Sequence, residues 1–440
     1  MATLAGWAQR SVRGPLGQMV ASLHRWRVGL ALWSLVDQGI VSLGTFLLGL
    51  LLARSLAPPE YGVYALIWGA LLFLRGFHTS LVTYPLSVVW AKTDREKRRV
   101  LVGGSLVLTV ALSLPLIAVV LLATVVIGRP TLAPWAVAAL LAGHFQETTR
   151  RVLMAGLRHS ATIPGDIVSY LGQVVAVWTI ASVWRVSVEI AFIVMALTSL
   201  LAALIQLGQL GAPALAGGEL AALVVRYWRL GQWLVLATLL SVFLTQAFPW
   251  VLGLMHGADE VARYQAAANL VFATHPLIFG LGNLLVPAVA QAQAVGGWDA
   301  SRRVVHSYGA LGAVLMGPYL GLLWLWPAGV LRLVYGADSS YVGLATEVRL
   351  FALAYMILYV NQLVGSLLLG LEQSRASFWS NLVGAAASIL AGIPLAASHG
   401  VGGALVGLSV SRLVQLGMLM TLLRRLRVTL DVQRSDTANR

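Results

Sequence analysis

Long apolar stretches follow one another along almost the whole chain, separated by short breaks that contain arginine, proline or glycine. About 20 apolar residues in a helix, at a rise of about 1.5 Å per residue, cross the hydrocarbon core of a bilayer. The pattern therefore predicts an all-α polytopic membrane protein. About twelve spans are expected, over residues 28–53, 61–90, 100–127, 132–157, 163–184, 186–208, 230–255, 263–293, 305–334, 346–371, 375–397 and 400–423.

The composition agrees with this interpretation. Hydrophobic residues make up 59% of the 440 residues and charged residues only 10%, whereas soluble domains average about 25% charged residues. The chain has no cysteine, which excludes disulfides and thiolate metal sites. A soluble globular protein is excluded as well.

The formal charge of +14 is distributed unevenly along the chain. About 22 basic residues lie in the N-terminal arm, the tail and the loops after even-numbered spans, against about 6 in the other loops. Basic loops favour the cytoplasmic side of a membrane. We therefore expect both termini in the cytoplasm of a cell with an inner membrane, and anionic lipid rather than nucleic acid as the partner of these charges.

Several short patterns occur twice, in the same order. The GLxxS pattern at residues 156–160 returns at 370–374, and proline residues Pro85 and Pro287 stand at corresponding places. A duplication predicts two six-helix lobes related by an axis along the membrane normal. The expected division is a basic arm at 1–27, an N-lobe at 28–208, a cytoplasmic linker at 209–229, a C-lobe at 230–423 and a basic tail at 424–440.

The segment LLGLLLARSLAPPEYGVYAL and the second-half segments ending in LLLGLEQS and VGGALVGLSVS carry a family resemblance. They are similar to the polysaccharide and O-antigen flippases of the multidrug/oligosaccharidyl-lipid/polysaccharide (MOP) exporter superfamily. The resemblance implies a central cavity between the lobes that opens alternately to each face. It also implies a polyprenyl-diphosphate-linked oligosaccharide as cargo, moved across the cytoplasmic membrane for surface or exopolysaccharide synthesis.

Two arginines lie inside predicted spans, Arg75 in the second and Arg412 in the last. A charge at the middle of a span costs at least ~3 kcal/mol in lipid, so each should face a partner or a wet cavity. We predict that both line the cavity and attract a diphosphate. The alternatives are an Asp37–Arg75 pair that orients the first two helices, and an Arg412 side chain that extends to the cytoplasmic interface.

Asp37 lies inside the first span. It could bind a coupling proton or sodium ion, since burial raises the pKa of a carboxyl group. It could equally be the counter-ion of Arg75 or Arg412. We favour the counter-ion, because an unpaired buried carboxylate is costly. The residues expected to line the substrate cavity are Arg75, Arg412, Asp37, His275, Asn269 and Asn361. No cofactor is expected.

The fourth span carries a cluster of titratable residues: His144, Glu147, Arg150 and Arg151. Glu147 is three and four residues from the arginines, so pairs within one helix are the simplest interpretation. A cytoplasmic gate, or a site where the diphosphate enters, is the alternative. The GLxxS alignment places Asn361 where the first half has Glu147, which predicts electrically unequal lobes.

The eighth span has a polar stripe that includes Gln265, Asn269 and His275. Gln265 and Asn269 are four apart and share a helix face, where they could bind sugar hydroxyls. His275 precedes Pro276 and could instead mark a kink. A lone histidine does not make a metal site, and no metal-ligand spacing occurs.

Three functions can be compared on these residues. A flippase needs a cavity with basic walls, whereas an ion-coupled drug antiporter of the same fold, of the MATE type, needs free acidic residues inside a lobe. An enzyme needs a catalytic motif or a large outer loop, and the outer loops here are only about 4–12 residues long. We predict a flippase that is not an enzyme and acts as a monomer, with polysaccharide polymerase or export machinery as candidate partners.

Overall fold

The computed structural model describes residues 15–215 and 217–438, and these residues form helices and short connections without a strand. The predicted all-α fold is confirmed. Along the first half lie α2 (Pro15–Ser55), α3 (Pro58–His78), η1 (Thr79–Thr83), α4 (Tyr84–Trp90), η2 (Arg95–Lys97), α5 (Arg98–Val126), η3 (Pro130–Leu132), α6 (Ala133–Ala155), α7 (His159–Asp166), η4 (Ile167–Leu171), α8 (Gly172–Val183) and α9 (Val188–Leu210). Along the second half lie α10 (Gly217–His256), α11 (Ala258–Phe272), α12 (His275–Leu325), α13 (Pro327–Tyr335), η5 (Ser340–Gly343), α14 (Ala345–Gly370), α15 (Ser374–Ala387), η6 (Ser388–Gly392) and α16 (Ile393–Ala438).

All twelve predicted spans fall mainly on helix. Within the described residues, 8 helical stretches are long and apolar enough to cross a membrane. Two of them exceed one span, at 51 residues (His275–Leu325) and 53 residues (Arg375–Arg427). Each contains a backbone break, at Gly297 and at Gly400, where φ is 61° and 58°. The breaks divide each long helix into two segments, and the exact count of twelve stays a prediction.

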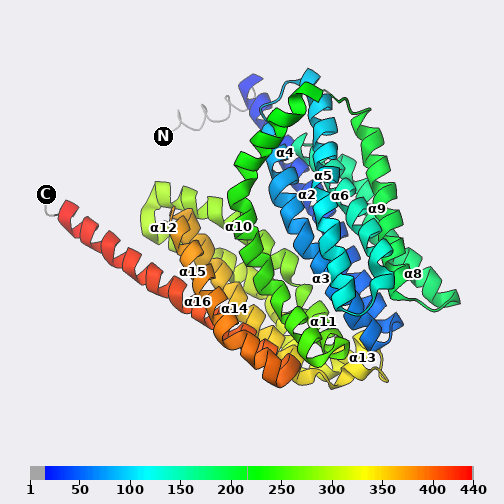
Figure 1. Ribbon diagram of the computed structural model, residues 1–440. Coiled ribbons are helices and arrows are strands. Elements are labelled where there is room, and N and C mark those ends of the chain that lie inside the picture. The colour runs from blue at the N-terminus through cyan, green and yellow to red at the C-terminus, as the bar shows by residue number, and fades with distance from the viewer. Residues whose placement is uncertain (1–14, 216, 439–440) are drawn as a thin grey trace.

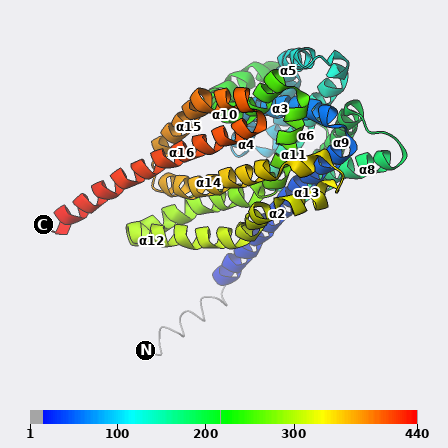
Figure 2. The same cartoon turned by 90° about the horizontal axis from the view of Figure 1, so that it is seen from below.

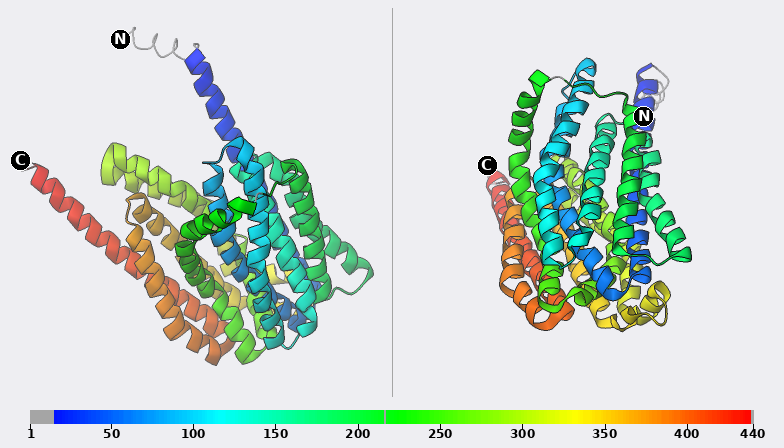
Figure 3. Two further views of the ribbon diagram at one scale, coloured as in Figure 1. Left: turned by 45° about the horizontal axis from the view of Figure 1, so that its top comes forward. Right: turned by 45° about the vertical axis from the view of Figure 1, so that its right-hand side comes forward.

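The helices form two groups. Helices α2 to α9 stand together, while α12, α14, α15 and α16 form the second group (Figure 1). The groups meet at the end that carries α11 and α13 and diverge toward the end where both termini lie (Figures 1 and 3). Seen from below, α11 and α13 lie where the groups join (Figure 2). Helix α10 runs between them and packs on α3, α11 and α16.

Two backbone features recur in the halves. The turns after α6 and α14 each contain one non-glycine residue with positive φ, Leu157 (57°) and Glu372 (62°). In both turns the next amide bonds a carbonyl five residues back: Arg158 to Leu153, and Gln373 to Leu368. A π-helical segment also interrupts the fifth predicted span of each half, as η4 and η6. These shared distortions support the predicted duplication.

The register of the repeat differs from the one that the GLxxS match indicates. The positive-φ residue is the second residue of the first GLxxS copy and the third residue of the second copy. The equivalent turns, at Leu157 and Glu372, therefore lie 215 residues apart rather than 214. Gln362, and not Asn361, is then the counterpart of Glu147. The predicted loss of charge in the second half is unchanged, because both residues are neutral amides.

Close contacts join the two groups at the end where they meet. A Cβ atom on Gly62 of α3 would lie 1.8 Å from the carbonyl oxygen of Ala258, so only glycine permits this approach to the start of α11. Asn269 of α11 donates its side-chain amide to the Tyr61 hydroxyl at 2.7 Å. Arg54 donates to the carbonyls of Val334 at 2.5 Å and Leu333 at 3.0 Å, near the C-terminus of α13. This end is thus closed by side-chain and backbone contacts.

Candidate functional site

Arg150 is the centre of a buried polar cluster in the first helix group. Its guanidinium pairs with Asp37 of α2 and, through Nε at 2.8 Å, with Asp166 at the end of α7. Glu147, one turn earlier on α6, lies 3.7 Å from the same guanidinium. The side chains are 9% (Arg150), 1% (Asp37) and 0% (Asp166) exposed. Arg150 therefore links α2, α6 and α7 through buried ion pairs.

Hydrogen bonds satisfy the remaining oxygens of the two aspartates. Thr162 donates its hydroxyl to Asp37 at 2.6 Å, and the Gln206 amide of α9 donates to Asp166 at 3.3 Å. Thr149 in turn donates to Gln206 at 2.8 Å. A buried ion pair is tolerated when its other hydrogen-bonding positions are filled. This arrangement meets that condition, so Asp37 is a counter-ion, and its partner is Arg150 rather than Arg75 or Arg412.

Arg75 lies beside the cluster and is held more loosely. Its Nη2 atom is 3.9 Å from a carboxylate oxygen of Glu147, longer than a hydrogen bond, and its side chain is 32% exposed. The same carboxylate accepts a 2.9 Å hydrogen bond from Arg151, four residues further along α6. Glu147 therefore faces three arginines, of which Arg75 has the weakest contact. Tyr170 is a further hydrogen-bond partner of Arg75, and the remaining guanidinium donors are available for an anion.

His144 is part of a second buried layer, apart from the ion pairs. Its ring stacks on His78 of α3, with centroids 4.3 Å apart. His144 bonds the Ser113 hydroxyl at 2.9 Å, and His78 bonds the Thr148 hydroxyl at 3.1 Å. The predicted cluster of four residues is thus divided: Glu147, Arg150 and Arg151 lie together, while His144 joins α3 and α5 to α6.

Arg412 in α16 is the charged group of the second helix group. Its Nη1 donates to Gln415 at 3.0 Å, and the backbone carbonyl of Arg412 accepts from the Asn361 amide at 2.9 Å. Among the described residues, no carboxylate lies within 4.0 Å of its guanidinium. The Asn361 side-chain oxygen is buried without a hydrogen-bond partner. An unpaired cation and an unsatisfied amide oxygen thus lie on neighbouring helices.

His275 lies in an aromatic cluster in the same helix group. It stacks on Phe272 with centroids 4.5 Å apart, and its Nε2 bonds the Tyr355 hydroxyl. Phe351 and Tyr264 extend the cluster, with ring centroids 5.1 Å apart. Aromatic walls with polar edges are typical of sites that bind sugars or amphiphiles. Among the described residues, no group of three or more histidine and acidic side chains is arranged to hold a metal ion.

Asn269 is used differently from the predicted stripe. It is 8% exposed, accepts from Gln265 at 3.0 Å and donates to Tyr61 across the junction of the groups. In this conformation both of its polar atoms are occupied by protein partners. Asn269 can meet a sugar only after the junction opens, so its predicted role in the cavity stays a prediction.

Asp166 was missed from the sequence, together with its partner Gln206 and with Thr162, the hydroxyl partner of Asp37. The signal was present: Asp166 stands within the predicted fifth span, and a carboxylate inside a span indicates a partner or a polar path. His78, at the end of α3 and within the second predicted span, was missed as well. The buried cluster therefore contains more residues than the sequence pattern indicated, drawn from four helices.

Comparison with solved structures identifies the fold. A multidrug resistance MATE family transporter of the MOP superfamily, in its inward-facing conformation, superposes with a TM-score of 0.72 at 13% identity, covering 88% of this chain and 94% of that chain. The lipid II flippase MurJ in an inward closed conformation gives 0.71 at 10% identity, with 90% and 87% covered. A MOP superfamily transporter from Pyrococcus furiosus gives 0.61 at 12% identity, with 91% and 95% covered.

These likenesses confirm the predicted MOP-type fold over nearly the whole chain. No protein-family model matches the sequence, and no curated protein matches it. The solved neighbours are transporters and flippases, which agrees with a multi-pass membrane protein. At 10–13% identity the similarity shows the fold alone, so the cargo has to be argued from the residues of this chain.

Proposed function

We propose that this protein is a flippase for polyprenyl-diphosphate-linked oligosaccharides. It captures the diphosphate-sugar head at the cytoplasmic face, carries it through the centre of the fold and releases it outside, while the lipid tail stays in the bilayer. Residues 28–208 and 230–423 act as the two moving lobes, with both termini in the cytoplasm of an inner membrane. Polysaccharide polymerase or export proteins are the partners that such a product requires.

One observation carries the choice of an anionic cargo. Three acidic side chains are buried among the described residues, Asp37, Glu147 and Asp166, and each is paired with Arg150. Arg75 and Arg412, in contrast, lack a carboxylate at hydrogen-bond distance among the described residues. The charged groups left for a ligand are therefore cationic, and a guanidinium binds phosphate oxygens with two donors at once.

The proposed mechanism uses the closed and diverging ends of the fold. The groups are joined at the end with Gly62 and Ala258 and diverge toward the termini (Figure 3), which corresponds to a state open to the cytoplasm under the predicted topology. Arg75 and Arg412, on different groups, bind the diphosphate from two sides. Release of the Tyr61–Asn269 contact and closure of the diverging ends then expose the head group to the other face.

The antiporter of the MATE type is the second candidate, because one of the similar structures is such a transporter. An antiporter that binds a cation needs a carboxylate free to accept it. Here Asp37 and Asp166 already hold the Arg150 guanidinium. A coupling ion would have to displace a buried arginine, which makes this function the weaker candidate.

The test is transport by charge-removing variants at normal abundance. Arg75→Ala and Arg412→Ala should each lower export of the lipid-linked sugar by about tenfold or more, since a charged hydrogen bond contributes about 1.5–3 kcal/mol. Arg349→Ala is the matched control, an arginine of α14 that is exposed and bonds the Trp324 carbonyl. Full activity in both variants would refute the proposed site. Equal loss in the control would show a general effect of removing an arginine.

A further inference from the structure

A basic cavity lies between α4 and the beginning of α10, and neither Arg75 nor Arg412 lines it. Its volume is about 670 Å³, and its walls combine apolar and cationic side chains. The cations are Lys92, Arg226 and Arg229, and the apolar wall includes Val88, Val225 and Leu230. Its lining residues come from the end of α4 and the beginning of α10, two segments that lie toward the end of the molecule where the helix groups diverge (Figure 1).

The three cations have no acidic partners in the part of the chain that the structure describes. None of them forms an ion pair within 4.0 Å, and all three side chains are exposed. The nearest acidic residues in sequence, Asp94 and Glu219, do not line the cavity. Three like charges around one cavity repel each other, and an anion relieves that repulsion.

The cavity has a fixed frame. Tyr227, between the two arginines on α10, is 2% exposed and bonds the Ser105 hydroxyl of α5 at 2.8 Å. Next to it, the connection before α10 is held by a hydrogen bond from the Ala214 amide to the Arg99 carbonyl at 3.0 Å. A Cβ on Gly231 would lie 2.3 Å from the Ser80 carbonyl, so α10 and η1 are in backbone contact. The cations are therefore presented from a rigid surface.

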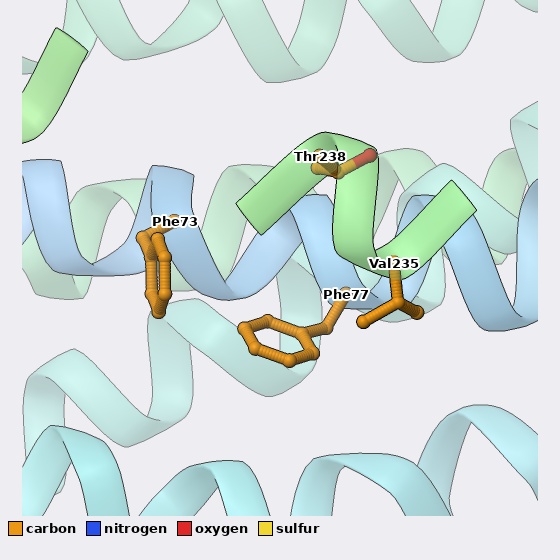
Figure 4. A pocket seen from close by; sticks show the side chains of 4 residues that line it. All are labelled: Phe73, Phe77, Val235 and Thr238. Carbon is orange, nitrogen blue, oxygen red and sulfur yellow. The ribbon is translucent and has the colours of Figure 1, made fainter. Parts of the chain in front are cut away.

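Further along, α3 and α10 pack closely and leave a gap too small for a water molecule. Phe73 and Phe77 of α3 face Val235 and Thr238 of α10, further from the basic cavity (Figure 4). Phe77 and Phe73 are four residues apart and lie on one helix face. The two rings thus close the contact between α3 and α10 at this point.

We propose that the α4–α10 cavity is a loading site for the diphosphate of a lipid-borne substrate, occupied before the head reaches Arg75. This inference rests on the proposed function and adds a second site to it. A diphosphate carries more negative charge and more acceptor oxygens than the phosphodiester of a common phospholipid, so it can use all three cations. The apolar wall of the cavity, with Val88, Val225 and Leu230, contacts the first isoprenoid units.

The experiment is photolabelling of the full-length protein in detergent micelles with a photoreactive geranylgeranyl diphosphate, with peptides identified by mass spectrometry. Label is expected on the α4 and α10 segments that contain residues 88–92 and 221–230. Lys92→Gln/Arg226→Gln/Arg229→Gln should reduce this labelling on the order of tenfold, because the bound diphosphate loses its three exposed cationic partners. The control Arg302→Gln/Arg303→Gln/Arg375→Gln removes equal charge from other loops of the same predicted face and should change nothing.

Competition identifies the ligand. Unlabelled geranylgeranyl diphosphate should displace the probe at lower concentration than phosphatidylglycerol or inorganic pyrophosphate. Equal displacement by phosphatidylglycerol would overturn the proposal in favour of a general anionic-lipid surface, and equal displacement by pyrophosphate would overturn the role of the lipid chain. Label confined to other peptides, or unchanged in the triple variant, would also overturn it.

The outcome is separable from that of the proposed function. In Arg75→Ala/Arg412→Ala, label on α4 and α10 should persist although transport is lost. Transport by the triple variant should need about tenfold more substrate for half-maximal rate, with the maximal rate retained. If the wild-type protein is labelled on α4 and α10 but transports nothing, the proposed flippase function is refuted and the binding site in the cavity still stands. If the triple variant transports as well as the wild type, the loading site is refuted.

Discussion

Removal of Arg150 should destabilise the protein far more than removal of its neighbour Arg151. In Arg150→Gln, Asp37 and Asp166 lose the guanidinium that pairs with both, while their side chains stay 1% and 0% exposed. Breaking a buried ion pair from one side costs about 3–5 kcal/mol, because an uncompensated charge remains in a medium of low polarity. Arg151 is 33% exposed and, among the described residues, forms an ion pair only with Glu147 of the same helix. Its loss should cost about 1 kcal/mol or less.

The assay is thermal unfolding in detergent, followed by the fraction of protein that remains monodisperse on a sizing column after heating. Arg150→Gln should unfold many degrees below the wild type, and Arg151→Gln within a few degrees of it. In Arg150→Gln/Asp37→Asn/Asp166→Asn the buried carboxylates are absent, so much of the lost stability should return. Equal melting of the two single variants would refute the reasoning. If the triple variant is no more stable than Arg150→Gln, the introduced amide side chains do not pack as the native ion pairs do.

Two further predictions concern the closed end. Gly62→Val should push α3 away from Ala258, because the carbonyl oxygen of Ala258 would lie 1.8 Å from the added Cβ. A cysteine introduced at Asn269 in this cysteine-free chain should then be labelled faster. The control is Gly39→Val, whose added Cβ meets nothing within 4 Å, and equal labelling in the two variants would contradict the prediction. Asn269→Leu leaves the fully buried Tyr61 hydroxyl without its donor and should lower the free energy of unfolding by about 1–3 kcal/mol. Asn269→Leu/Tyr61→Phe should recover part of this stability, and no recovery would argue against the contact.

The sequence predicted the positions of the charged residues better than their partners. Asp37, Glu147 and Arg150 were all identified, and the counter-ion role of Asp37 agrees with the structure. Its partner proved to be Arg150 because the rotation and depth of α2 against α6 and α7 decide which side chains meet, and hydrophobic runs carry no information on that rotation. Asp166 could have been found, since a carboxylate inside a predicted span needs a partner.

The helical elements could be predicted because burial in a bilayer imposes length and apolarity on every span. The sequence indicated where the turns after α6 and α14 lie, but it did not indicate which residues of the two turns correspond to each other. Leu157 and Glu372 adopt the same positive φ, a backbone property that the GLxxS letters do not encode, so the register was wrong by one residue. The occupation of Asn269 by Tyr61 was also beyond the sequence, because it depends on which end of the fold is closed.

The central claim is that this protein moves the head of a polyprenyl-diphosphate-linked oligosaccharide across the membrane. The direct measurement is the lipid extract of cells with and without the protein, assayed by mass spectrometry for such lipids and by leaflet-selective labelling of their sugars. The account predicts that the lipid-linked sugar accumulates on the cytoplasmic leaflet without the protein, and that the wild-type gene, but not Arg75→Ala/Arg412→Ala, restores export. An unchanged lipid pool, with altered sensitivity to cationic drugs instead, would contradict the account and favour an antiporter.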